Sequence, residues 1–245
     1  MLLTALLGSA LAQDTLTRTL PASMPSLRVV APHSRVTVRS DPGAGQTVVY
    51  ATPVRWSEGC SLDLDGDSQE AVATVRVPET GAVPRCRTDL EIVLAGRTEV
   101  ELDLDRGRVV LLGPSAPVQV RLGTGRVEGQ LASSGGRFEV ERGRVDLNGL
   151  RDPVSAEVGL GAVVIELEEA LAGTVEARVG VGRVRVRYPY GTWLDKDVEA
   201  AVGRVWTAIP SRSSSPSRLL ARAGLGSVRV ETVLTDELAP EVAGR

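Results

Sequence analysis

The 245-residue chain has few aromatic residues, since Phe, Trp and Tyr together make up 3% of it. A core filled by large rings is therefore excluded, and the interior has to consist of small and β-branched side chains, which favour strands. The chain also has one histidine, His33, and two cysteines. Serine-protease triads and tetrahedral zinc sites need more such groups than these. The sequence therefore predicts no catalytic centre of either kind, no metal site and no cofactor.

Neither sign of charge is in large excess, because the formal net charge is −3. Such a chain has no general attraction for nucleic acid, so no nucleic-acid partner is expected. A long apolar stretch occurs only in residues 1–12, MLLTALLGSALA. It is too short to span a bilayer, and it ends in the small-x-small pattern that signal peptidase cleaves. The sequence predicts a signal peptide over 1–12 and a leader over 13–26.

An exported chain of this kind is expected in the periplasm, at the cell surface or outside the cell, with no transmembrane segment after cleavage. The two cysteines are Cys60 and Cys86. An even number of cysteines in an exported chain favours a disulfide over free thiols.

A glycine that recurs at steps of 18 to 23 residues is the strongest signal in the sequence. The copies are Gly107, Gly125, Gly143, Gly161, Gly182, Gly203 and Gly226. Apolar residues stand seven, five and three positions before the glycine and two and four after it, as in Val100, Leu102, Leu104, Val109 and Leu111. Alternation with period two on both sides of a glycine is typical of two short strands separated by a bend.

Such repeats bury their apolar faces only by stacking on one another. The sequence therefore predicts an all-β fold, a single-stranded parallel β-solenoid (β-helix) with 18–23-residue coils, over residues 27–233. Residues 96–233 form the regular coils. Residues 27–95 form a less regular half with the disulfide-closed excursion, and 234–245 are a C-terminal tail.

Three copies depart from the pattern. Gly136 and Lys196 stand seven residues before their repeat glycines, which predicts shortened or frayed first strands in these two copies. Near the N-terminus the register reappears with Ser34 in place of the glycine, which predicts an eighth copy.

A short motif recurs in the repeats, as in Gly125-Arg126-Val127, Gly143-Arg144-Val145, Gly182-Arg183-Val184 and Gly203-Arg204-Val205. This motif resembles the Gly-Asp-Val repeats of exported bacterial β-strand-repeat proteins regarded as adhesins. The resemblance covers roughly Leu27 to Val233 and implies a β-solenoid exposed at the cell envelope, without catalytic residues. Arginine stands where that family often has aspartate, so no role of that aspartate is carried over.

An arginine follows the repeat glycine in five copies, and stacking predicts one exposed column broken at Ala162. Its members are Arg108, Arg126, Arg144, Arg183 and Arg204. The column could bind sulfated, phosphorylated or uronic polymers through bidentate contacts. The alternative is a solvated face whose charges are neutralised locally, because Glu128 and Asp146 lie on the same face.

The densest aromatic group contains Tyr188, Tyr190 and Trp193, with Trp206 one coil later at an outward position. Aromatic rings on a rigid coil could stack on sugars or dock a partner protein. Equally, they could cap the core beneath a loop between coils.

Two acidic stretches have structural interpretations. Acids alternate with apolar residues over 99–105, which predicts outward charges on a strand. The segment 63–70, DLDGDSQE, has its glycine at the fourth position, whereas an EF-hand loop needs it at the sixth. An Asp-Gly hairpin turn explains it better than a calcium site.

These observations favour a non-enzymatic β-solenoid of the cell envelope, an adhesin or scaffold that binds polysaccharide or another envelope protein through its outer faces. The alternative is a carbohydrate-active β-helix enzyme that acts on an envelope or extracellular polysaccharide. A self-assembling filament is a third hypothesis.

Overall fold

The computed structural model describes residues 15–22, 24–56, 60–66, 70–76, 86–131, 134–169 and 171–233, and these residues form strands and connections without a helix. The all-β prediction is therefore confirmed for the described part of the chain. The predicted signal peptide and C-terminal tail lie outside it. In chain order the strands are β1 (Leu16–Pro21), β2 (Ser26–Val30), β3 (His33–Ser40), β4 (Gln46–Arg55), β5 (Ser61–Gly66), β6 (Glu70–Arg76), β7 (Arg87–Leu94), β8 (Glu99–Leu112), β9 (Val118–Gln130), β10 (Gly136–Leu150), β11 (Val154–Leu167), β12 (Gly173–Pro189), β13 (Asp195–Thr207) and β14 (Ser217–Val233).

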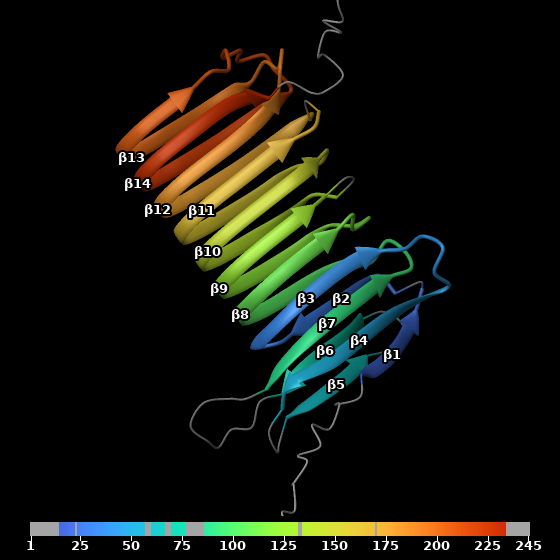
Figure 1. Ribbon diagram of the computed structural model, residues 1–245. Helices are drawn as coiled ribbons and strands as arrows, with labels where there is room; N and C mark the ends of the chain where they lie inside the picture. Colours follow the sequence, from blue (N-terminus) through green and yellow to red (C-terminus); the bar gives the residue numbers. More distant parts are fainter. Residues whose placement is uncertain are drawn as a thin grey trace, which may run out of the picture.

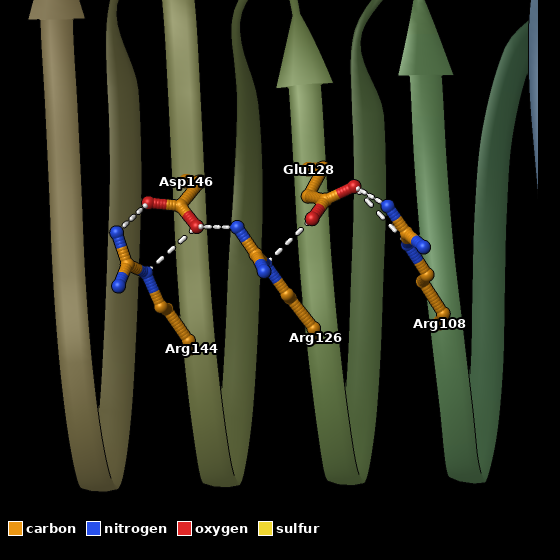
Figure 2. A network of polar contacts seen from close by, with 5 residues as sticks. All are labelled: Arg108, Arg126, Glu128, Arg144 and Asp146. Atoms are coloured by element: carbon orange, nitrogen blue, oxygen red, sulfur yellow. Dashed lines mark hydrogen bonds and ion pairs between the residues drawn. The ribbon is translucent and has the colours of Figure 1, made fainter.

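The strands from β8 onward lie side by side as a parallel stack (Figure 1). The repeat glycines are in register, so that Gly107 lies opposite Gly125 and Gly125 opposite Gly143. Each of these strands doubles back, as Figure 2 shows for part of the stack, and the alternation of buried residues is interrupted around the repeat glycine. The stack therefore has two layers. Layer A contains the halves before the bend, and layer B contains the halves after it.

Toward the N-terminus the two layers continue as separate strands. In layer A, β2 pairs with the first half of β8, β6 pairs with β2, and β5 pairs with β6. In layer B, β3 pairs with the second half of β8, followed by β7, β4 and β1. Ser34 lies opposite Gly107, in the register expected of an eighth copy.

The prediction of a parallel solenoid throughout residues 27–233 is wrong for the N-terminal part, where the sheet is mixed. The pairs β1–β4, β4–β7 and β5–β6 are antiparallel. The pair β5–β6 is the hairpin expected from the Asp-Gly segment, although residues 67–69 lie outside the described ones. The short connection of the β5–β6 hairpin can return the chain only antiparallel, since a parallel neighbour needs a longer crossover. The pairs β1–β4 and β4–β7 join strands that are separated by two other strands in the chain.

The core lies between the two layers and follows the predicted register. In β8 the inward residues Val100, Leu102, Leu104, Val109 and Leu111 are all buried. The equivalent positions of β11, β12 and β14 are also buried. Both layers thus contribute small aliphatic side chains to one continuous core.

The predicted fraying at Gly136 is not observed, because β10 begins at this residue. Phe138 is fully buried, and its ring explains the absence of a side chain at Gly136. A Cβ atom on Gly136 would lie 3.1 Å from two ring carbons of Phe138 and 2.3 Å from the carbonyl oxygen of Val118. The large ring fills the space that an apolar residue occupies in the other copies.

The order of the last strands differs from the order in the chain, because β14 lies between β12 and β13. Strand β14 presents Leu219, Ala221 and Ala223 to the core, all of them buried. Strand β13 presents Lys196 instead, opposite Leu219. A terminal strand pair is covered on one side only, so the copy with the less apolar inner face takes the end position.

Lys196 also departs from the predicted fraying, because β13 starts one residue before it. Its ammonium group donates hydrogen bonds to the Thr207 hydroxyl at 3.1 Å and to the carbonyl oxygen of Ile209. Thr207 belongs to layer B, so the lysine links the two layers at the end of the stack. Burial of the ammonium group lowers the pKa of Lys196.

Cys60 and Cys86 form the predicted disulfide. Cys60 directly precedes β5 of layer A, and Cys86 directly precedes β7 of layer B. The bond therefore joins the two layers at the end of the stack where the strands are separate pieces of chain.

Replacement of both cysteines, Cys60→Ser and Cys86→Ser, is expected to lower the free energy of unfolding by about 3.5 kcal/mol, the chain-entropy value for a loop of this length. The loop spans 26 residues. Urea denaturation of the double variant beside the oxidised protein measures the difference, and the reduced native protein is the control. A loss below about 1 kcal/mol would show that the open chain already holds these segments together.

Candidate binding surface

The outward face of layer B carries a row of residues one position after the repeat glycine. In spatial order the row is Arg35, Arg108, Arg126, Arg144, Ala162, Arg183, Ser227 and Arg204. The structure thus aligns the five predicted arginines and their break at Ala162. It adds Arg35 at one end and a second break at Ser227, because β14 separates β12 from β13.

Three arginines of this row are paired with two carboxylates, which stand two residues after the arginine in β9 and in β10 (Figure 2). Arg108 and Arg126 both contact Glu128, with 2.6 Å between Arg126 Nε and Glu128 Oε1. Arg126 and Arg144 both contact Asp146, each with a nitrogen–oxygen distance of 2.7 Å. For β8 to β10 the row is therefore a ladder of alternating charges, as the local-neutralisation interpretation predicts.

The ladder stops at β11, where Ala162 and Val164 stand in place of the arginine and the acid. Beyond it, the position of the acid is taken by Arg185 in β12 and Arg229 in β14. A hollow of about 440 Å³ opens here. We call it the arginine notch, and its lining residues are Arg144, Val164, Gly182, Arg183, Val184, Arg185, Ser227 and Arg229.

The notch has fewer acids than arginines. Glu231 is shared by Arg185, Arg187 and Arg229, at 3.3, 3.0 and 2.6 Å. Burial opposes ionisation of this carboxyl, but the hydrogen bond from Arg187 and the neighbouring positive charges prevail and lower the pKa of Glu231. Arg183 has no ion-pair partner within the described part of the chain. Arg187 is also paired with Glu166 at 2.9 Å, so among the arginines that line the notch Glu231 contacts Arg185 and Arg229. Because Arg183 is unpaired among the described residues, the lining carries an excess of positive charge.

The predicted aromatic group is divided by the structure. Tyr188 is fully buried in the core, so its assignment to a binding site is wrong: its position in β12 faces inward, and it fills space between the layers. Burial raises the pKa of the Tyr188 hydroxyl. Tyr190 and Trp193 are 67% and 52% exposed in the connection from β12 to β13.

Trp206 lies elsewhere, on the outward face of layer B. It stands opposite Arg229, whose guanidinium carbon is 4.7 Å from the centre of the Trp206 ring. Since β14 intervenes, Trp206 is two strands from β12 and not one, as the sequence order suggested. The Trp206 ring thus lies beside the arginine notch. Tyr190 and Trp193 lie in the connection that follows the layer B half of β12, away from the bend.

The bend itself carries a feature that the sequence reasoning missed. The residues directly before the repeat glycine form a row that is polar in β8 to β10, with Arg106, Thr124 and Arg142. From β11 onward the row is aliphatic, and its members are Leu160, Val181, Leu225 and Val202, at 55%, 44%, 52% and 62% exposure. We call these four residues the apolar ridge. An aliphatic residue within the Gly-x-Gly motif was the signal available in the sequence.

The outward face of layer A is more acidic. Carboxylates of Asp103, Asp105, Glu141 and Glu157 line a hollow of about 660 Å³ together with two arginines. The acids of 99–105 point away from the core, as predicted. Among the described residues no group of three or more histidine, cysteine, aspartate or glutamate side chains is arranged to hold a metal ion.

No family model and no curated protein sequence matches this chain. Solved structures do align with it, including the following two. One, described as a "putative cell adhesion protein" from Clostridium sporogenes, has a TM-score of 0.41 and 13% identity, and covers 90% of this chain and 99% of its own. The other, a "putative adhesin" from Bacteroides fragilis, has a TM-score of 0.45 and 12% identity, and covers 90% and 98%. Both TM-scores are below 0.5, so the likeness to either structure is a distant one.

The resemblance to Gly-Asp-Val repeats therefore remains limited to the Gly-Arg-Val motifs. Within the residues that the structure describes, there is no helix long and apolar enough to cross a membrane.

Proposed function

We propose that this protein is an exported, non-enzymatic β-solenoid of the cell envelope that binds an acidic polysaccharide through the outer face of layer B. The arginine notch is the observation that carries the proposal. Four arginines line it, and Glu231 and Asp146 are the carboxylates that contact them. Guanidinium groups bind sulfate and carboxylate groups through two parallel hydrogen bonds. Export is supported by the apolar stretch 1–12 and by the disulfide.

The stack suits a repeating ligand. The strands β8 to β14 are parallel and in register, and neighbouring strands of a sheet lie about 4.8 Å apart. Side chains at equivalent positions are therefore held at fixed intervals along layer B. Trp206, which is 48% exposed beside the notch, offers a ring on which a sugar can stack.

Binding without turnover is proposed because of the ionisation state of Glu231, the carboxyl that contacts Arg185 and Arg229 of the notch. A glycosidase needs a carboxylic acid whose raised pKa keeps it protonated near neutral pH. The three arginines around Glu231 have the opposite effect and lower its pKa. Glu231 therefore orients arginines and is unsuited to donate a proton to a leaving group.

The chain from Gln13, which contains every described residue, is to be screened for binding to a sulfated glycan, a polyuronate and a neutral glucan, together with an assay for released reducing ends. We expect binding to the two acidic polymers, no binding to the neutral glucan, and no release. Release of reducing ends would instead establish the carbohydrate-active enzyme. Binding to none of the three would refute the proposed function.

The site within layer B is tested by two double variants that remove the same charge. Arg183→Gln with Arg185→Gln is expected to weaken binding of the acidic polymers at least about ten-fold, because each charged hydrogen bond contributes about 1.5–3 kcal/mol. Arg108→Gln with Arg126→Gln is the matched control, since both of these arginines are paired with acids, whereas Arg183 is unpaired among the described residues and Arg185 shares Glu231 with two other arginines. Titration calorimetry measures both affinities, and equal losses would mean that general charge, and not the notch, binds the polymer.

A further inference from the structure

The apolar ridge is not required by the fold. In β8, β9 and β10 the same position at the bend holds Arg106, Thr124 and Arg142, and these strands stack in the same register. The position points to solvent, since all four ridge side chains are at least 44% exposed. Polar residues are therefore compatible with it, and the four aliphatic ones leave apolar surface in water at a cost in solubility.

The ridge is continuous. Leu160 lies opposite Val181, Val181 opposite Leu225, and Leu225 opposite Val202. Four strands in register place these side chains over about 14 Å, because each strand spacing is about 4.8 Å. A glycine or alanine precedes each of them and a glycine follows, so no larger side chain from the adjacent positions covers the ridge.

Positive charge accompanies the ridge on one side. Arg183 and Arg204 stand two residues after Val181 and Val202, on the outward face of layer B. Neither arginine has an ion-pair partner among the residues that the structure describes. The change from polar to aliphatic at the bend and the end of the charge ladder on layer B occur at the same strand, β11. The row before the repeat glycine becomes aliphatic and the row after it loses its paired acids at the same strand. This coincidence points to one ligand that is both apolar and anionic.

The dimensions of the ridge argue against a second copy of the chain as the occupant. Stable protein interfaces bury about 800 Å² on each partner, and four half-exposed aliphatic side chains provide far less. A lipid surface makes no such demand, because aliphatic side chains can enter the headgroup region while adjacent arginines contact phosphates. The aliphatic residues lie at the bend, which forms a narrow edge of the two-layered stack (Figure 1). A narrow edge can insert between lipid headgroups.

We infer that the β11–β13 end of the stack docks edge-on onto an anionic lipid surface, with the apolar ridge among the headgroups and Arg183 and Arg204 on lipid phosphates. This inference goes beyond the proposed function, because its apolar contacts are made by the bend, although Arg183 also lines the arginine notch. It places the long axis of the stack parallel to the lipid surface, and it leaves Arg144, Arg185 and Arg229 of the notch for the polymer.

The test measures sedimentation of the chain from Gln13 with vesicles of phosphatidylcholine that contain a quarter phosphatidylglycerol. The ridge variant is Val181→Thr with Leu225→Thr, since Thr124 already occupies this position in β9. The matched control is Val54→Thr with Leu112→Thr, two residues at 47% and 44% exposure away from the ridge. We expect about ten-fold weaker partition for the ridge variant and less than about two-fold for the control. Vesicles of phosphatidylcholine alone should bind neither.

Four outcomes would overturn the inference: no binding of the native chain to the anionic vesicles, equal binding of the ridge variant and the control, a dimer in analytical ultracentrifugation that the ridge variant dissociates, or loss of polysaccharide binding in the ridge variant with vesicle binding unchanged. The polysaccharide assay separates this inference from the proposed function. A ridge variant that binds acidic polysaccharide normally and vesicles poorly supports both, and a native chain that binds polysaccharide but no vesicles leaves the proposed function intact.

Discussion

Gly143→Ala is expected to lower the free energy of unfolding by at least about 4 kcal/mol, at the extreme of what single substitutions do. Gly143 has a φ of +144°, which L-residues rarely adopt. A Cβ atom there would also lie 1.8 Å from the carbonyl oxygen of Gly125 in the neighbouring strand. The Cβ would belong to the bend of β10 and the carbonyl oxygen to the bend of β9, and each of these strands is paired on both sides. Relief of the contact therefore requires β9 and β10 to separate.

Urea denaturation followed by circular dichroism measures this loss. Gly45→Ala is the matched control, because a Cβ at Gly45 would have no atom within 4 Å, and we expect a change within about 0.5 kcal/mol. A small loss at Gly143 would show that the stack can open locally at one bend. It would then contradict the view that the glycine column limits which residues the bend accepts.

The repeat could be predicted from the sequence because it depends on residues that are close together in the chain. Alternation of period two around Gly107 places Val100 and Leu111 on the inner face of their strand whatever the neighbouring strands are. The close approach of glycines in adjacent strands follows from the same register. Phe138 could not be understood in this way, because its ring compensates for Gly136 through a contact between residues of one inner face.

The order of the strands depends on residues that are far apart in the chain, and the predicted order of the last strands was wrong. Consecutive repeats usually lie side by side, so the sequence placed β13 next to β12. The structure places β14 there, because the inner face of β14 is apolar and that of β13 contains Lys196. The antiparallel pairs of β1, β4 and β5 were missed for a related reason: period-two alternation reports which face is buried but not the direction of the partner strand.

The candidate surfaces depend on that strand order. The arginine row and its neutralisation by Glu128 and Asp146 could be predicted from spacing alone. The notch could not, because it requires Arg229 of β14 to lie beside Arg185 of β12, although 44 residues separate them in the chain. The apolar ridge needs the same arrangement, since Leu225 joins Val181 to Val202. Sequence therefore fixes which residues face outward, and packing of the last two strands decides which of them meet.

Phe138→Ala is expected to lower the free energy of unfolding by about 3–5 kcal/mol, the usual loss for a buried phenylalanine. Phe138 is fully buried in layer A of β10, and Gly136 provides no side chain that could move into the space. A Cβ at Gly136 would lie 2.3 Å from the Val118 carbonyl oxygen, so the backbone is already close to its neighbour and cannot collapse further. The cavity should therefore stay open, which places the loss toward the upper end of the range.

The same denaturation experiment measures this loss, with Tyr190→Ala as the control aromatic truncation. Tyr190 is 67% exposed, so its removal should change stability by no more than about 0.5 kcal/mol. Phe138→Leu should recover more than half of the loss, because leucine fills part of the cavity without a polar atom. If Phe138→Ala and Phe138→Leu are equally stable, the ring does not fill the space beside Gly136. The register of the core would then have to be explained by the aliphatic residues alone.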